Sequence, residues 1–204
     1  MVTRRSFIAC LPLIPLSRAV FAADQTFNPF ANVRFIAPER SDPSLSITDE
    51  EEPGEWIVIR GLVTDGLTHV RGVSIFVYHA DWMGRYTVDE MRLGARTKPR
   101  LHGAMRTDTN GRYCFDTIRP GPYPHQPLPA QIHWVVTAPG FKDLKIQMWF
   151  ADDPMISSEK RAEAANDAAH DGEQVVILPM ARDARGVWHS LFDITLTRIE
   201  RSGI

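Results

Sequence analysis

The chain is broken into short segments rich in β-branched and aromatic residues, and Gly or Pro punctuates the intervals between them. Fifteen Pro and thirteen Gly occur among the 204 residues, whereas few stretches have the periodicity of an amphipathic helix. This pattern predicts an all-β fold, and short strands with frequent turns are typical of a β-sandwich. We expect strands at residues 56–63, 70–78, 112–118, 132–137, 144–150, 174–180 and 188–196.

Three segments depart from this pattern of strands. Residues 24–54 contain several Pro and an acidic cluster at 49–52, which predicts an irregular lead-in with a solvated turn, ahead of a domain at 55–204. Residues 108–111 are Asp-Thr-Asn-Gly, and they predict a hairpin turn because Asn-Gly readily adopts positive φ. Residues 157–171 are rich in Glu, Lys and Ala, so we expect a short helical or loop insertion near the C-terminus.

The first 23 residues have the composition of an export signal. A basic start is followed by an apolar run at 7–16, and Val20-Phe21-Ala22 has small residues at the spacing of a cleavage site. Arg4 and Arg5, with the Ser-Phe that follows, resemble a twin-arginine signal, so we expect export to the periplasm or beyond. An ordinary secretory signal is the alternative. The apolar run is too short to span a bilayer, so we expect no membrane attachment of the mature form.

Net charge and cysteine content limit the possible partners and disulfides of the chain. The formal net charge is −2, which gives no reason to expect nucleic acid as a partner. Cys10 lies in the export segment, so the mature chain keeps only Cys114 and cannot form an intramolecular disulfide. Cys114 lies between Tyr113 and Phe115 in a predicted strand, and we expect a buried structural thiol.

The candidate chemistry centres on two phenols and an imidazole. Gln131 and His133 lie two residues apart in a predicted strand, so their side chains share a face while Ile132 points into the core. Tyr123 stands between two Pro residues, which restrict the backbone and aim the ring, and Tyr86 lies upstream. Phenolate is a hard donor, so this set suggests a ferric iron site. A hydrogen-bonded structural His and a Tyr that packs over the sheet edge are the alternatives.

Two other His residues receive structural interpretations. His79 follows a predicted strand, and we expect it in the core or behind the site rather than as a ligand. His102 is expected in a loop that borders the pocket. The sequence has no recognisable Ser–His–Asp set, Gly-rich phosphate loop or Cys-rich zinc spacing.

In this order, the segments resemble the intradiol ring-cleavage dioxygenases, the family of catechol and protocatechuate 3,4-dioxygenases. The resemblance covers about residues 56–154. It rests on 61–65 with 73–78 as the opening strand pair, 80–86 and 106–124 as the segments that carry the two Tyr, 129–133 (Pro-Ala-Gln-Ile-His) as the P-x-H-I-H ligand strand, and 147–150 with 153–154 as the strand after it.

The resemblance implies non-haem Fe(III) held by two tyrosinates and two His. It also implies that O2 cleaves a catechol-type aromatic ring between its two hydroxylated carbons. Tyr86 and Tyr123 match the phenolate ligands, His133 matches an imidazole ligand, and Gln147 matches a Gln beside the bound aromatic. Dimers occur in the family, which leaves a homodimer open.

At one ligand position the chain departs from the family pattern. Gln131 stands where the family has its first His. An amide oxygen binds iron more weakly than imidazole, so we expect a lower metal affinity or a changed coordination number. His125, which lies between Tyr123 and Gln131, is an alternative donor.

A second departure concerns charge stabilisation. Leu128 lies near the position where many members carry an Arg that stabilises developing negative charge. Arg85, Arg119 and His125 are candidates for this task, and we take Arg85 together with Gln147 as the catalytic pair.

Two other functions remain open. Gln131 and Leu128 favour a catalytically impaired or non-catalytic descendant that binds an aromatic, a metal or a partner. Residues 107–113 and 120–123 also resemble regulatory transthyretin-like domains, which bind carbohydrate or protein. Such a binding module would need neither Tyr86 nor His133.

Overall fold

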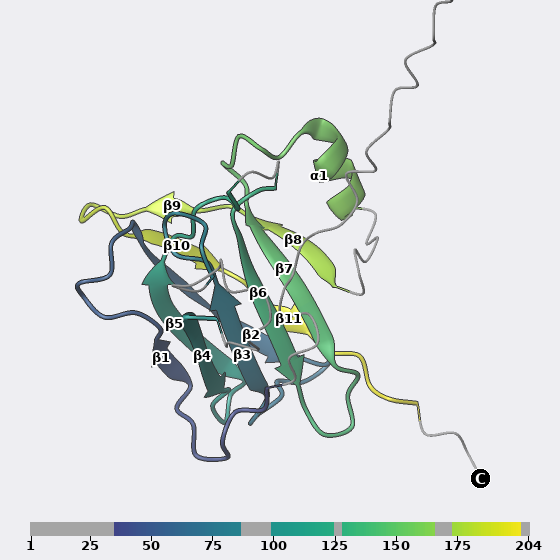
Figure 1. The fold of residues 1–204 in the computed structure, drawn as a ribbon. Coiled ribbons are helices and arrows are strands. Elements are labelled where there is room, and N and C mark those ends of the chain that lie inside the picture. The colour runs from purple at the N-terminus through teal and green to yellow at the C-terminus, as the bar shows by residue number, and fades with distance from the viewer. Residues whose placement is uncertain (1–34, 87–98, 125–127, 166–172, 201–204) are drawn as a thin grey trace, which may run out of the picture.

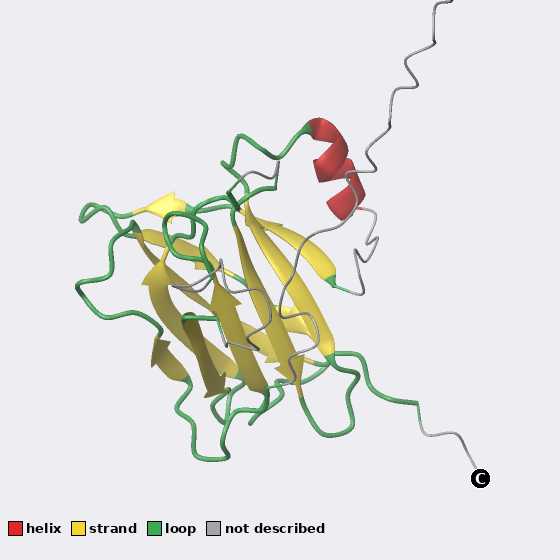
Figure 2. Cartoon of the chain, in the orientation of Figure 1, coloured by secondary structure: helices red, strands yellow, loops and turns green. Residues whose placement is uncertain are grey.

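The computed structural model describes residues 35–86, 99–124, 128–165 and 173–200, which form two packed β-sheets (Figures 1 and 2). The first sheet has the order β1 (Ser44–Ser46), β5 (Arg112–Ile118), β2 (Trp56–Thr64), β10 (Trp188–Leu191) and β9 (Ala181–Arg182), and β11 (Ile194–Thr195) also pairs with β2. The second sheet has the order β4 (Leu101–Arg106), β3 (Ser74–His79), β6 (Gln131–Thr137), β7 (Leu144–Phe150) and β8 (Gln174–Leu178). The all-β sandwich predicted from the sequence is confirmed.

Alternate side chains of the central strands fill the space between the sheets. Trp134 of β6 meets the rings of Tyr113 and Phe115 edge-on, with centroid distances of 5.8 and 5.1 Å. Its strand neighbours Ile132 and Val136 belong to the same fully buried cluster. Because successive strand residues point to opposite faces, the residues between them face outward from the second sheet. The candidate site lies on that outer face.

Most predicted strands are present, but β4 was not predicted. Strands β5 and β7 have the predicted bounds, and β2, β3, β6 and β8 lie at the predicted positions with slightly different ends. The sequence of β4, Leu-His-Gly-Ala-Met-Arg, lacks β-branched residues, so its strand character depends on pairing with β3. The expectation that His102 lies in a loop is therefore wrong, because His102 pairs with Tyr78 inside this sheet.

The turn at 108–111 forms, but it does not close a hairpin. The Asp108 carboxylate accepts hydrogen bonds from the backbone N–H groups of Asn110 and Arg112, each at 2.8 Å. Gly111 has the expected positive φ of 74°. However, β4 pairs with β3 and β5 pairs with β2, so the turn carries the chain from one sheet to the other. The turn residues determine the local bend, and strand pairing elsewhere determines the partner.

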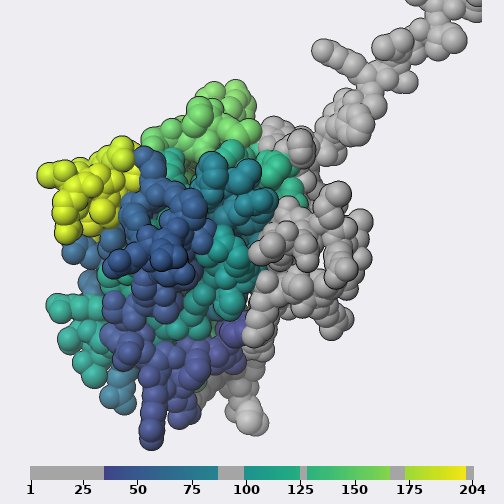
Figure 3. All heavy atoms as spheres, turned by 60° about the vertical axis from the view of Figure 1, so that its left-hand side comes forward, coloured from purple at the N-terminus to yellow at the C-terminus, as the bar shows by residue number. Residues whose placement is uncertain are grey.

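The described part of the lead-in packs onto the domain and is irregular apart from β1, which pairs in parallel with β5. The carboxylate of Glu52 accepts two hydrogen bonds from Arg100 at 2.6 and 2.7 Å, so the acidic turn is only partly solvated. This pairing lowers the pKa of Glu52. The guanidinium of Arg106 donates to the carbonyl oxygens of Ala37 and Pro38 at 2.7 and 2.9 Å. Figure 3 shows the lead-in, in purple, in direct contact with the strands.

The predicted insertion contains the helix α1 (Ser158–Ala165), which lies at one end of the sheets (Figure 1). It belongs to the connection between β7 and β8, which pair in parallel and so need a crossover of a dozen or more residues. Residues 166–172 and the predicted export segment 1–23 lie outside the described residues. No helix in the described ranges is long and apolar enough to cross a membrane.

Candidate active site

One row of side chains crosses the outer face of the second sheet at the level of His133. In the strand register, His133 of β6 pairs with Tyr78 of β3 and with Gln147 of β7, and Gln147 pairs with Val175 of β8. Paired residues on neighbouring strands project from the same face, so the four side chains form a line. His133 and Gln147 are 1% and 0% exposed. This part of the outer face is therefore covered by other segments.

The imidazole of His133 has contacts on three sides. Its Nε2 lies 3.0 Å from the hydroxyl oxygen of Tyr86, and its Nδ1 lies 3.3 Å from Oε2 of Glu173. The ring of Tyr78 stacks on it with a centroid distance of 4.8 Å and an interplanar angle of 11°. These contacts fix both the plane of the imidazole and the direction of each nitrogen.

The two segments that carry Tyr86 and Tyr123 pack backbone against backbone. A Cβ added at Gly84 would lie 2.0 Å from the carbonyl oxygen of Pro122, and one added at Gly121 would lie 2.3 Å from the carbonyl oxygen of Trp82. Only glycine permits this approach at both positions, and Gly84 also has a positive φ of 80°. The two glycines thus bring both phenols to one place, although 37 positions separate them in the sequence.

The carboxylate of Asp81 organises the turn that leads to Tyr86. Its Oδ1 accepts hydrogen bonds from the backbone N–H groups of Met83 and Arg85 at 2.9 and 3.0 Å. Its Oδ2 accepts one from Nε of Arg85 at 3.0 Å. The side chain of Arg85 is 49% exposed. The structure therefore places this predicted catalytic residue in the Tyr86 turn, paired with a buried carboxylate.

Both phenols and the Gln131 amide meet at a small pocket. Tyr86, Tyr123 and Gln131 line it together with Ala80, Gly121 and Pro129. The rings of Tyr86 and Tyr123 have centroids 6.3 Å apart. Gln131 is buried, and its Oε1 accepts a hydrogen bond from Nε1 of Trp149 at 3.3 Å. The four predicted metal ligands are thus brought together, because His133 contacts Tyr86 directly.

Gln147 is the residue of this row whose buried polar atoms lack hydrogen-bond partners in the described part of the chain. It is fully buried, and neither its Oε1 nor its Nε2 has a hydrogen-bond partner in the described part of the chain. A buried amide without a partner costs about 1–3 kcal/mol. An amide kept at this cost beside His133 is free to bind a group that enters the site.

The other candidates for charge stabilisation lie in different surroundings. Arg119 donates two hydrogen bonds to Asp152 at 2.8 and 2.9 Å, and its guanidinium lies 4.6 Å from the centre of the Phe150 ring. Leu128 is half-buried and carries no charge. His125 lies outside the described residues. The charge of Arg119 is thus already neutralised by the Asp152 carboxylate.

Two residues around His133 were missed in the sequence. Tyr78 was assigned to a strand but not to the site, although strand alternation and pairing with β6 place it there. No sequence pattern indicates Glu173 as a site residue, because it follows the insertion and reaches His133 only through the pairing of β7 with β8. His79 is confirmed as a core residue, since it is 0% exposed and its Nε2 lies 2.8 Å from Oγ1 of Thr117. This burial lowers its pKa to about 4.

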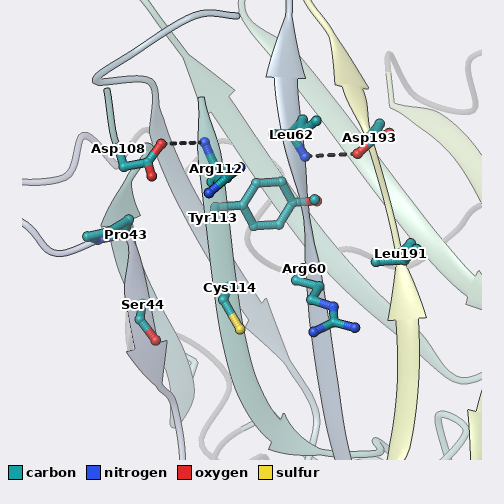
Figure 4. A pocket seen from close by; sticks show the side chains of 11 residues that line it. Pro43, Ser44, Arg60, Leu62, Asp108, Arg112, Tyr113, Cys114, Leu191 and Asp193 are labelled. Carbon is teal, nitrogen blue, oxygen red and sulfur yellow. Dashed lines mark hydrogen bonds between the residues drawn. The ribbon is translucent and has the colours of Figure 1, made fainter. Parts of the chain in front are cut away.

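A larger hollow lies on the outer face of the first sheet (Figure 4). It measures about 580 Å³, and Arg60, Leu62, Cys114 and Leu191 are among its lining residues. Cys114 is half-buried rather than buried in the core, because Tyr113 and Phe115 take the inward positions of β5. Burial raises the pKa of the Cys114 thiol, so it stays neutral and unreactive at neutral pH. None of the predicted metal ligands lines this hollow.

Comparison with known proteins shows the family to which the chain belongs. A family model described as dioxygenase matches residues 30–197. The protocatechuate 3,4-dioxygenase beta chain of Burkholderia cepacia is 33% identical over 198 residues, which cover 91% of this chain and 82% of that protein. The chain belongs to the intradiol dioxygenase family. Catechol 1,2-dioxygenase 2 of Acinetobacter lwoffii is 30% identical over 57% of this chain, and the match spans only 47% of that longer relative.

Solved structures show the same intradiol dioxygenase fold. The 3-chlorocatechol 1,2-dioxygenase of Rhodococcus opacus 1CP superposes with a TM-score of 0.60 at 24% identity, over 82% of this chain and 70% of that one. The dioxygenase domain of a carbohydrate-binding fusion protein from Streptomyces sp. SirexAA-E superposes with a TM-score of 0.58 at 24% identity, over 86% and 97%. The β-sandwich is therefore the fold of the family.

The donors at the candidate site fit ferric iron. The described residues contain no group of three or more His, Cys, Asp and Glu that could hold a metal, so a metal here would depend on Tyr86, Tyr123 and Gln131 beside one His. Phenolates are hard anionic donors and suit a hard cation. Nε2 of His133 lies 3.0 Å from the Tyr86 oxygen, so these two donor atoms are neighbours at the site.

Proposed function

We propose that this chain is an exported, non-haem Fe(III) intradiol dioxygenase that uses O2 to cleave a catechol-type ring between its hydroxylated carbons. The observation that carries the proposal is the convergence of Tyr86, Tyr123, Gln131 and His133. Three of them line one pocket, and the fourth contacts Tyr86. Segments far apart in the sequence supply them.

The site residues have distinct tasks in this proposal. Tyr86, Tyr123 and His133 would hold the iron, and Gln131 would supply a weaker amide oxygen. When bound, ferric iron would supply the Lewis acidity that makes a chelated catecholate reactive toward O2. The unpaired amide of Gln147 would donate a hydrogen bond to the bound aromatic or to the O2 that reacts with it. The burial of His133 and Gln147 keeps bulk water away from the reacting groups.

The two departures from the family pattern set the expected strength of the site. Gln131 already accepts a hydrogen bond from Trp149, so its oxygen is a modest donor, and we expect weaker iron binding than with two imidazoles. Leu128 brings no charge to the reaction. Arg85 retains a place in the Tyr86 turn, but its partner Asp81 offsets its charge. We therefore propose a slow enzyme rather than an inactive one.

The substrate class follows from the chemistry of the site and from the relatives. Related proteins bear the names protocatechuate 3,4-dioxygenase, catechol 1,2-dioxygenase, hydroxyquinol 1,2-dioxygenase and chlorocatechol 1,2-dioxygenase. The named aromatics all carry two adjacent hydroxyl groups, which suits chelation of one metal by both oxygens. We propose an aromatic diol of this class as the substrate.

The test is the iron content and visible spectrum of the purified mature protein, followed by O2 uptake with a panel of catechols. We expect a tyrosinate-to-Fe(III) charge-transfer band that shifts when catechol is added, with diacid product and O2 consumed in equal amounts. Tyr123→Phe should weaken or shift the band. Tyr113→Phe is the matched control, because that phenol lies in the first sheet and bonds to the carbonyl oxygen of Phe192; its band should stay unchanged.

The same measurement separates the alternatives. A band that shifts with catechol but gives no product would indicate a non-catalytic family member, which the substitutions at Gln131 and Leu128 favour. Protein that stays colourless after iron is supplied would contradict the proposal and favour a metal-free binding module.

Export and assembly are separate parts of the proposal. Replacing Arg4 and Arg5 by Lys keeps the charge of the signal but removes the twin-arginine pair, so the unprocessed protein should accumulate inside the cell. Unchanged export would point to an ordinary secretory signal. Light scattering of the mature protein would test the homodimer.

A further inference from the structure

Glu173 is a buried carboxylate that touches the candidate iron ligand His133. Its side chain is 5% exposed, and its Oε2 lies 3.3 Å from Nδ1 of the imidazole. It reaches this place because it precedes β8, whose Val175 pairs with Gln147 in the row described above. The crossover that contains α1 therefore delivers an acidic side chain to the covered face of the second sheet.

The two nitrogens of His133 have different partners. An ionised carboxylate only accepts hydrogen bonds, so Glu173 in its ionised form requires a proton on Nδ1. In the Nδ1–H tautomer the lone pair is on Nε2, which faces the Tyr86 hydroxyl at 3.0 Å. The Tyr78 ring, stacked on the imidazole, holds its plane. The donor atom of the imidazole is thus prepared on the side where the phenol oxygen lies.

We propose that Glu173 is a positioning residue for the iron site: its carboxylate fixes the Nδ1–H tautomer of His133 and strengthens Nε2 as a metal donor. This inference rests on the proposed iron-dependent function. A carboxylate behind a metal-bound imidazole raises the basicity of that imidazole. The effect matters more here than in a site with two imidazoles, because Gln131 supplies only an amide. Glu173 thus compensates in part for the missing His.

The burial of Glu173 argues against a purely structural task. Removing a carboxylate from water costs several kcal/mol unless its partners compensate. A neutral Gln would span the same distance at a smaller desolvation cost if only a hydrogen bond were needed. The charge itself is therefore the property to test.

The metal-free protein offers the first test. The 15N chemical shifts of the His133 ring distinguish its tautomers, and we expect the proton on Nδ1 in the wild type. In Glu173→Ala the tautomer ratio should move toward a proton on Nε2. A wild-type ring with its proton on Nε2, or a ratio that Glu173→Ala does not change, would overturn the proposal whether or not iron binds.

The iron-loaded protein offers the second test, with Glu173→Gln and Glu173→Ala compared against Glu55→Gln. Glu55 receives the same chemical change just before β2 of the first sheet, where it bonds to Trp188. Chelator competition should show iron affinity reduced about 10- to 100-fold in Glu173→Ala and less in Glu173→Gln. The charge-transfer band should move to longer wavelength in both, because a weaker imidazole leaves the iron more electron-poor. Glu55→Gln should match the wild type.

The outcomes separate this inference from the proposed function. A wild type that binds no iron contradicts the iron-dependent function. A coloured wild type whose band and affinity stay the same in Glu173→Gln and Glu173→Ala overturns the task of Glu173 and leaves the function standing. If Glu173→Ala does not fold, Glu173→Gln alone decides, since unchanged affinity and band in that variant would exclude a contribution of the charge.

Discussion

Gly84 lies so close to Pro122 that a Cβ at position 84 would come within 2.0 Å of the Pro122 carbonyl oxygen. This contact joins the turn before Tyr86 to the loop before Tyr123. The relative position of the two phenols therefore depends on a backbone contact that any larger side chain would break. Glycine is required here for two reasons: the close contact with Pro122, and a positive φ of 80°.

Gly84→Ala should separate the two Tyr loops. We expect a loss of stability of more than about 1–3 kcal/mol, the usual cost of an unfavourable backbone conformation alone, together with loss of iron binding. Gly66→Ala is the matched control, because Gly66 has a similar φ of 87° and no atom within 4 Å of the added Cβ. Denaturant unfolding and iron titration of both variants measure the difference. Equal losses in the two variants would show that the contact with Pro122 contributes nothing.

Gln131→His should restore the family's second imidazole. Imidazole is a stronger donor than an amide oxygen, so iron affinity should rise by about tenfold or more, at least the effect that a partner behind a metal ligand has. Turnover of catechol should rise with iron occupancy. Gln174→His, at the start of β8, adds a His outside the pocket and serves as the control. An affinity unchanged by Gln131→His would mean that residue 131 does not ligate the metal.

The sequence predicted the local features of this molecule better than its long-range pairings. Alternation along β6 correctly placed Ile132 in the core and His133 on the opposite face, because side-chain direction in a strand depends only on its period of two. β4 was missed, since its strand character comes from pairing with β3. Glu173 was missed for a related reason: its contact with His133 depends on the order β6-β7-β8 in the sheet, and no local pattern encodes that order.

His79 should make the protein less stable in mild acid. Burial lowers its pKa to about 4 from an unfolded value of 6.5, so the unfolded chain binds the proton more tightly than the folded one. The contribution of neutral His79 to the free energy of unfolding is fully present above pH 6.5 and is lost as the pH falls toward 4. Between pH 7.5 and 5 the loss should be about 2 kcal/mol. Unfolding free energies of the wild type and His79→Gln at both pH values isolate this part, because the depressed carboxylate pKa values are common to both. Identical pH dependence in the two proteins would contradict the prediction.

Gln147→Met should raise stability and lower activity. The substitution removes a buried amide that has no partner in the described part of the chain, so the free energy of unfolding should increase by up to about 1–3 kcal/mol. If the amide donates to the bound aromatic or to oxygen, kcat should fall by about 10²-fold, as when one preorganised donor is removed, while iron content stays unchanged. Gln174→Met is the matched control, because Gln174 is half-buried on β8 and pairs with Ile146 rather than with the row of His133. If the variant is more stable and equally active, the buried amide of Gln147 takes no part in the reaction. Its unpaired burial would then destabilise the fold without contributing to catalysis.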